Sequence, residues 1–134
     1  MKKTVFTISL LTALTQAHID DKVLYAFEAK CMGCHDTYKK NKLAPPLVAV
    51  NQVYLRLTDN NMSEAMEHMK KFLSMPSEDK TLMKPAVKLF GVMPKMDFNE
   101  TEIEDFSQVL VETEFEIPDW FNEHYRSHEL NKTE

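Results

Sequence analysis

The sequence predicts an all-α fold of about three main helices plus a C-terminal helical extension, all formed by a single domain. Apolar residues recur at intervals of three and four in several segments, which is the spacing of one helix face. Residues that commonly cap helices precede these segments. The 134 residues are close to the size at which one core suffices, and neither an internal repeat nor a long linker divides them.

Residues 1–17 have the pattern of a secretory signal peptide. Lysines near the start precede a mostly apolar run over residues 4–14, and the small residues that follow predict cleavage after Ala17. The apolar run is too short for a membrane-spanning helix, although an uncleaved anchor is the alternative, and no later segment is apolar enough to span. We therefore expect export of a domain comprising residues 18–134; the resemblance described below implies the periplasm as its location.

The chain is acidic, with 21 Asp and Glu residues against 16 Lys and Arg residues and a net charge of −5 at pH 7. Cleavage of the signal would remove Lys2 and Lys3 and make the balance more negative. Proteins that bind nucleic acids use basic surfaces to neutralise phosphates. The composition therefore argues against nucleic acid as a partner.

The first helix is predicted to begin at Asp20 or Asp21, either of which can cap it, and to run to about Lys30. Val23 and Phe27 are four residues apart on one face of this helix, which also leads to Cys31. Between residues 36 and 60 the helical spacing is lost and two adjacent prolines intervene. This segment is predicted to be a loop folded over the surface.

The second main helix is predicted to begin at Asn61 or Ser63 and to end before Pro76. Its apolar face is rich in methionine, and we interpret this as core packing because Met fills irregular gaps and the spacing is helical. The residues of this face are Met62, Met66, Met69, Phe72 and Leu73.

A short helix is predicted at residues 85–90, with a proline at its start and Gly91 at its end. The last core helix follows a capping-box pattern in which Asn99 precedes Glu102 by three positions. Its predicted apolar face consists of Ile103, Phe106, Val109 and Leu110.

The C-terminal extension starts at about residue 114, and Pro118 can open a helix in it. We interpret this helix as a brace packed on the domain; the alternatives are a docking face for a redox partner or a metal or haem ligand role for His124 and His128. Its aromatic face comprises Ile117, Trp120, Phe121, His124, Tyr125 and His128.

The segment Cys31-Met32-Gly33-Cys34-His35 contains both cysteines of the chain, with an imidazole directly after the second. In an exported protein two thiols are expected to pair, yet a disulfide over so short a loop would constrain little chain. A thioredoxin-type site would need strand-helix-strand flanks, and a zinc site would need more ligands. The pattern indicates covalent attachment of one c-type haem through Cys31 and Cys34, with His35 as the proximal iron ligand.

Met93 directly precedes Pro94, which disfavours helical backbone at the methionine and favours an extended loop. Such a loop suits a side chain that projects toward a metal. Met96, three residues later, is the main competitor for this role, whereas Met75 and Met83 fit helical or turn packing better.

These motifs resemble the class I cytochromes c, the monohaem electron-transfer domains, and specifically members of the bacterial periplasmic type. The resemblance covers about Asp20 to Thr113. It implies that the helices wrap around one covalent haem, that the carbonyl of Pro45 accepts a hydrogen bond from the imidazole of His35, and that Met93 is the sixth ligand. It also implies that Phe27 packs against the last core helix. The matching segments are Cys31-Met32-Gly33-Cys34-His35, Ala44-Pro45-Pro46-Leu47 and Gly91-Val92-Met93-Pro94.

The function that the resemblance implies is single-electron transfer between larger periplasmic redox proteins, performed by a monomeric carrier that is not an enzyme. The alternative is a haem-based gas sensor or an accessory haem domain of a redox enzyme, in which the sixth ligand is labile. The identity of the sixth ligand distinguishes the two functions.

Overall fold

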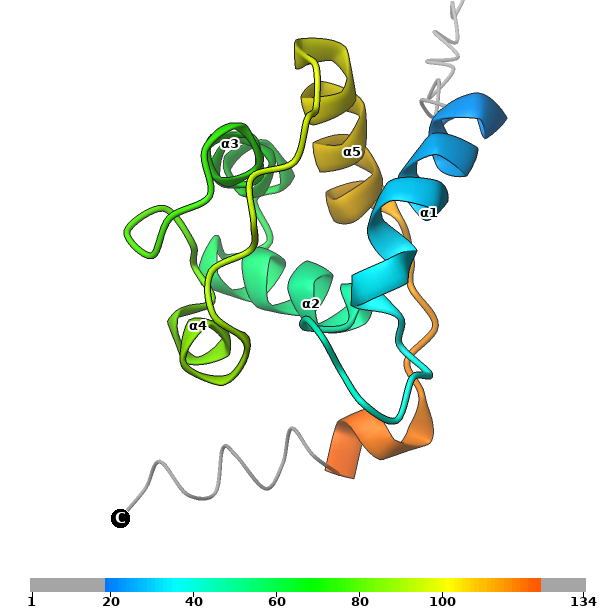
Figure 1. Ribbon diagram of the computed structural model, residues 1–134, viewed down its shortest axis with the longest axis vertical. Coiled ribbons are helices and arrows are strands. Elements are labelled where there is room, and N and C mark those ends of the chain that lie inside the picture. The colour runs from blue at the N-terminus through cyan, green and yellow to red at the C-terminus, as the bar shows by residue number, and fades with distance from the viewer. Residues whose placement is uncertain (1–18, 124–134) are drawn as a thin grey trace, which may run out of the picture.

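Residues 19–123 are described by a computed structural model, and this part of the chain is all-helical, as predicted, with no β-strand (Figure 1). The predicted signal peptide, His124 and His128 lie outside the described residues. A short helical segment at residues 119–123 follows the last main helix. The main helices are α1 (Asp21–His35), α2 (Leu47–Leu57), α3 (Met62–Ser74), α4 (Lys84–Phe90) and α5 (Glu100–Glu112).

The helix starts predicted from capping residues are confirmed. A side-chain oxygen of Asp20 accepts a hydrogen bond from the backbone N–H of Lys22 at 2.8 Å, and Asn61 caps α3 in the same way. Asn99 and Glu102 form a reciprocal capping box at the start of α5. Gly91 ends α4 with a φ of 77°, a conformation that glycine adopts without steric cost.

Two predictions about the first half of the chain are wrong. The first helix does not end at about Lys30 but continues to His35, so the Cys-Met-Gly-Cys-His segment is helical. Residues 36–60 are not all loop, because α2 follows directly after Pro46, whose extended backbone (φ −61°, ψ 148°) makes it the N-cap. Proline lacks the N–H that an N-terminal position leaves unpaired, so the two prolines precede a helix instead of excluding one.

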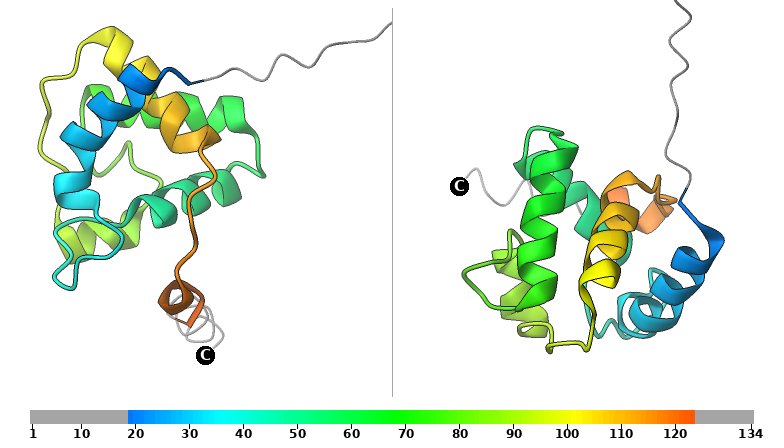
Figure 2. Two further views of the ribbon diagram at one scale, coloured as in Figure 1. Left: turned by 90° about the vertical axis from the view of Figure 1, so that its right-hand side faces the viewer. Right: turned by 90° about the horizontal axis from the view of Figure 1, so that it is seen from above.

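Helix α5 lies between α1 and α3, and it also contacts α2 (Figures 1 and 2). The predicted pairing of the first and last core helices is present, because the ring of Phe27 meets the ring of Phe106 edge to face with centroids 5.5 Å apart. Phe98, just before α5, packs on the other side of Phe106 at 5.3 Å. Within residues 19–123, no helix is both long and apolar enough to cross a membrane.

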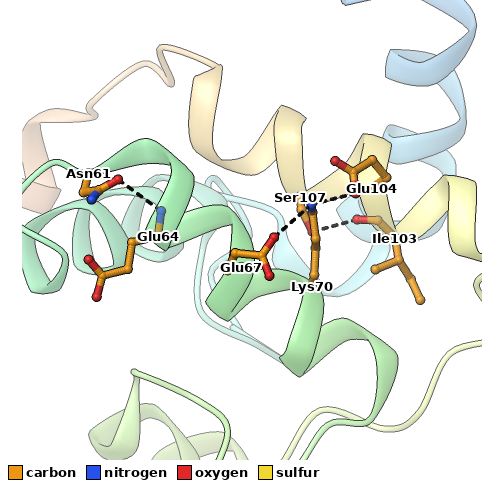
Figure 3. A network of polar contacts seen from close by, with 7 residues as sticks. All are labelled: Asn61, Glu64, Glu67, Lys70, Ile103, Glu104 and Ser107. Carbon is orange, nitrogen blue, oxygen red and sulfur yellow. Dashed lines mark hydrogen bonds and ion pairs between the residues drawn. The ribbon is translucent and has the colours of Figure 1, made fainter.

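Helices α3 and α5 approach closely because small residues line their contact. Ala65 and Ser107 are both fully buried, and the Ser107 hydroxyl donates to the carbonyl of Ile103 within its own helix at 2.6 Å (Figure 3). At the edge of this contact Lys70 Nζ lies 2.7 Å from Glu104 Oε2 and 3.2 Å from Glu67 Oε1. The methionine face of α3 is buried only in part.

On that methionine face, Met69 and Leu73 are buried as predicted, whereas Met62 is 53% exposed. Met62 is the first residue of α3, beyond the end of the contact with α5. The C-terminal end of α5 is held from α2, where the side-chain amide of Asn51 donates to the carbonyls of Leu110 at 2.9 Å and Val111 at 3.2 Å. Carbonyls in the last turn of a helix lack N–H donors from their own helix, so the buried amide satisfies them.

Candidate functional site

The described residues line an apolar cavity, partly open to solvent, with about 180 Å³ of water-accessible space. Protein interiors leave few voids larger than a water molecule, and the roughly 10–15 Å³ that one water needs is far smaller than this cavity. A cavity of this size and polarity is therefore the natural site for a bulky apolar group. Apolar residues of its wall include Phe27, Leu47, Val50, Met69, Phe90, Phe98 and Leu110.

All five residues predicted for the site line this cavity. Cys31, Cys34 and His35 come from the last turns of α1, where helical backbone places residues three or four apart on one side. Pro45 comes from the loop before α2, and Met93 comes from the extended segment between α4 and α5. The fold thus brings three separate segments of the chain to one cavity, although their roles as ligands stay predictions.

The imidazole of His35 is held by the backbone carbonyl predicted from the resemblance. Its Nδ1 lies 2.6 Å from the carbonyl oxygen of Pro45. A carbonyl can only accept, so Nδ1 carries the proton and donates it, and Nε2 of the neutral ring keeps its lone pair. That lone pair is what a metal ligand requires, and the hydrogen bond fixes the ring orientation.

Burial keeps the imidazole in this neutral form. The pKa of His35 is lowered mainly because burial disfavours the charged ring, while the hydrogen bond to Pro45 opposes the shift. A proton on Nε2 would compete with a metal for the same lone pair. The environment therefore favours the protonation state in which His35 can bind iron.

The two thiols are free in the structure, and they differ in environment. Burial raises the pKa of Cys31 to about 11, although the nearby charge of Lys30 acts in the opposite direction. Reactive cysteines of redox enzymes have a lowered pKa, because the thiolate is the nucleophile. Cys31 therefore does not have the environment of a thioredoxin-type nucleophile. Cys34, three residues later in the same motif, is exposed.

The four methionines considered for the sixth ligand differ in whether they line the cavity and in how deeply they are buried. Met93 and Met96 both line the cavity from the loop that precedes α5, and both are partly buried. Met83 also lines the cavity, at the N-cap of α4, whereas Met75 is 58% exposed and does not line it. Met93 in addition packs against the buried core cluster.

Sequence reasoning missed the wall that α2 contributes. Tyr54 is 2% exposed and lines the cavity together with Thr81. Burial raises the pKa of the Tyr54 phenol, and a hydrogen bond with the Thr81 side chain partly offsets this shift. Leu47, Val50 and Tyr54 recur at offsets of three and four, which is the signal for a helix face. The β-branched residues and the preceding prolines obscured this signal.

These residues fit a covalently bound haem. Two thiols and a neutral imidazole lie at the end of one helix, and a thioether lies on a separate extended segment of the same cavity. A thioether and an imidazole are both known iron ligands, and the apolar wall matches the macrocycle. Among residues 19–123, no group of three or more His, Cys, Asp or Glu side chains could hold a metal ion by itself. Comparisons with family models, curated proteins and solved structures find no match to the chain.

Proposed function

We propose that this chain is a monohaem electron-transfer protein of the cytochrome c type, exported to the periplasm. The observation that carries the proposal is that one apolar cavity is lined by both thiols of the attachment motif, by His35 and by Met93. The hydrogen bond between His35 and Pro45 adds support, because it leaves the lone pair of the other ring nitrogen available.

Each residue has a defined role in this proposal. Cys31 and Cys34 would hold the haem through thioether bonds, and His35 and Met93 would bind its iron. A bound haem supplies a reversible one-electron change at iron. The chain supplies the ligands, their orientation and an apolar wall that excludes water.

The ligand set favours electron transfer over gas binding. With an imidazole and a thioether both bound, no coordination position is open to a small molecule. A thioether is a soft ligand that stabilises the reduced metal, so the reduction potential is expected to exceed that of a haem bound by two histidines. Donor and acceptor would be larger periplasmic redox proteins, which reach a monomeric carrier by diffusion.

The decisive experiment expresses the full-length chain with a haem-attachment system and examines the exported product. Intact mass should equal the processed chain plus one haem, and acidified organic solvent should not extract the haem. The protein should cycle between oxidised and reduced spectra without loss of haem. A product with the mass of the bare chain, or with extractable haem, would contradict the proposal.

The same preparation separates the electron carrier from a gas sensor. Reduced protein with both axial positions filled should bind carbon monoxide only slowly at neutral pH. Rapid binding would show that the sixth ligand is labile and would assign the cavity to a sensor or an accessory haem domain.

A further inference from the structure

Lys42 is positioned at the centre of the loop that separates His35 from Pro45. Its Nζ donates to the backbone carbonyls of Asp36 at 3.3 Å, Thr37 at 2.5 Å and Lys39 at 2.8 Å. An ammonium group has three N–H donors, so these contacts use all of them. Hydrogen bonds from a charged donor are stronger than those between neutral groups. One side chain thus ties together the whole first half of the loop.

The C-terminal extension contacts this loop from outside. Lys42 Nζ lies 5.0 Å from the centre of the Trp120 ring, which is a favourable distance for a cation–π interaction. The Tyr38 hydroxyl of the same loop donates to a carboxylate oxygen of Glu116 at 3.0 Å. Next to Trp120, the Phe121 ring is only 7% exposed, so it anchors the extension. In Figure 1 the short helix of the extension lies at the same end of the molecule as the loop after α1.

The loop matters because its two ends carry the two partners of the proximal hydrogen bond. His35 is the last residue of α1, and Pro45 is the last loop residue before the N-cap of α2. Helices α1 and α2 each pack on α5, so the loop is the direct covalent connection between the two partners of this 2.6 Å contact. An ordered loop limits how far the two helix ends can move relative to each other.

We propose that Lys42, held in place by Trp120, is a positioning residue that fixes the loop and thereby maintains the hydrogen bond from His35 to the carbonyl of Pro45. This inference rests on the proposed function where it concerns haem. A hydrogen bond from the outer ring nitrogen makes the imidazole a more basic ligand and so stabilises oxidised iron. Through this chain of contacts the C-terminal extension influences the reduction potential without touching the cavity.

The test compares Lys42→Met with Lys40→Met in the full-length protein. Both variants remove one positive charge from the same loop, but Lys40 is exposed and its control variant leaves the three carbonyl contacts of Lys42 in place. Amide hydrogen exchange in peptides covering residues 36–45 should be faster by roughly tenfold or more in Lys42→Met and unchanged in Lys40→Met. The reduction potential of haem-loaded Lys42→Met should rise, because the imidazole becomes less basic.

Trp120→Leu provides a second, milder test that leaves the loop sequence intact. It should accelerate exchange in the same peptides by a smaller factor and shift the potential in the same direction. Equal exchange in Lys42→Met and the wild type would overturn the proposal, and so would faster exchange with an unchanged potential. If the protein takes up no haem, the proposed function fails, while the exchange comparison still decides whether Lys42 and Trp120 fix the loop.

Discussion

At the scale of single residues, the cavity contains two methionines that could serve as the sixth ligand. Met93 and Met96 belong to the same extended segment and both reach the cavity wall. Met93 precedes Pro94, which holds its backbone extended, and it packs against the core. We therefore expect Met93 to bind iron and Met96 to fill space.

Met93→Ala should abolish the weak thioether-to-iron charge-transfer band near the red edge of the visible spectrum, because that band requires the bond. The same change should lower the reduction potential and open the reduced iron to carbon monoxide. Absorption spectra, potentiometric titration and carbon monoxide binding measure the three effects. Met96→Ala is the matched control and should leave all three nearly unchanged; the reverse pattern would transfer the role to Met96.

The candidate site residues that belong to short sequence motifs could be predicted from the sequence. The Cys-Met-Gly-Cys-His motif and the Met-Pro pair predict Cys31, Cys34, His35 and Met93 as site residues without knowledge of the fold, and all four line the cavity. The role of Lys42 was not predictable, because its three carbonyl partners are brought together by the path of a loop and not by any residue spacing. The contribution of Tyr54 to the cavity wall was also not predicted, because the helix that carries it, α2, was not predicted.

At the scale of helices, an aromatic pair packs in the contact between α1 and α5. Phe27 is 3% exposed and its ring meets Phe106, so Phe27→Ala would leave a cavity at the centre of the interface. The expected loss in free energy of unfolding is about 3–5 kcal/mol, measured by chemical denaturation. Tyr25→Ala is a control in the same helix, because Tyr25 is 77% exposed and its loss should cost little. A loss for Phe27→Ala no larger than that of the control would contradict this packing.

The ion pair between α1 and α5 should make stability depend on pH in the acid range. Lys30 Nζ lies 2.5 Å from Glu102 Oε1, and this contact, followed by the capping hydrogen bond from Asn99, lowers the pKa of Glu102 from 4.5. Because the folded-state pKa is the lower one, the contribution is present above pH 4.5 and is lost as the pH falls through the folded-state value.

Glu102→Gln removes this charge while a glutamine can still close the capping box. The difference in unfolding free energy between wild type and Glu102→Gln should be constant near neutral pH and shrink below about pH 4.5, and salt should reduce it. Glu100→Gln, in the same first turn of α5, is the matched control. A difference that does not change with pH would show that the pair contributes nothing electrostatic.

The three helices with explicit capping residues were predictable, and so was α4 from the proline at its start and the glycine at its end, whereas α2 was not. Asp20, Asn61 and Asn99 mark the starts of α1, α3 and α5, and all are observed as caps. Helix α2 begins after a proline that makes no side-chain cap, so its start carries no comparable signal. The continuation of α1 through Gly33 to His35 was not predictable from local propensity, because glycine is a poor helix former.

At the scale of the whole molecule, the position of the cavity implies that a haem bound there, as proposed, would be part of the core. An unfilled apolar cavity lacks the contacts that hold its wall, so the protein without haem should be less stable. Cys31→Ala/Cys34→Ala should therefore show a lower midpoint of thermal unfolding and bind the dye ANS, as loosely packed states do. Cooperative unfolding at the wild-type temperature without haem would contradict the proposed role of the cavity.

The docking of α1 on α5 also has a consequence for the order of events during biosynthesis. Lys30 and Glu102, which join these helices, are 72 residues apart in the chain, so their contact closes a long loop. Contacts of such large sequence separation form late, and a chain made from its N-terminus has no α5 when α1 first emerges. If haem is attached as proposed, the Cys-Met-Gly-Cys-His motif at the end of α1 would remain accessible to an attachment enzyme until α5 arrives, and closure of the fold would then cover the haem.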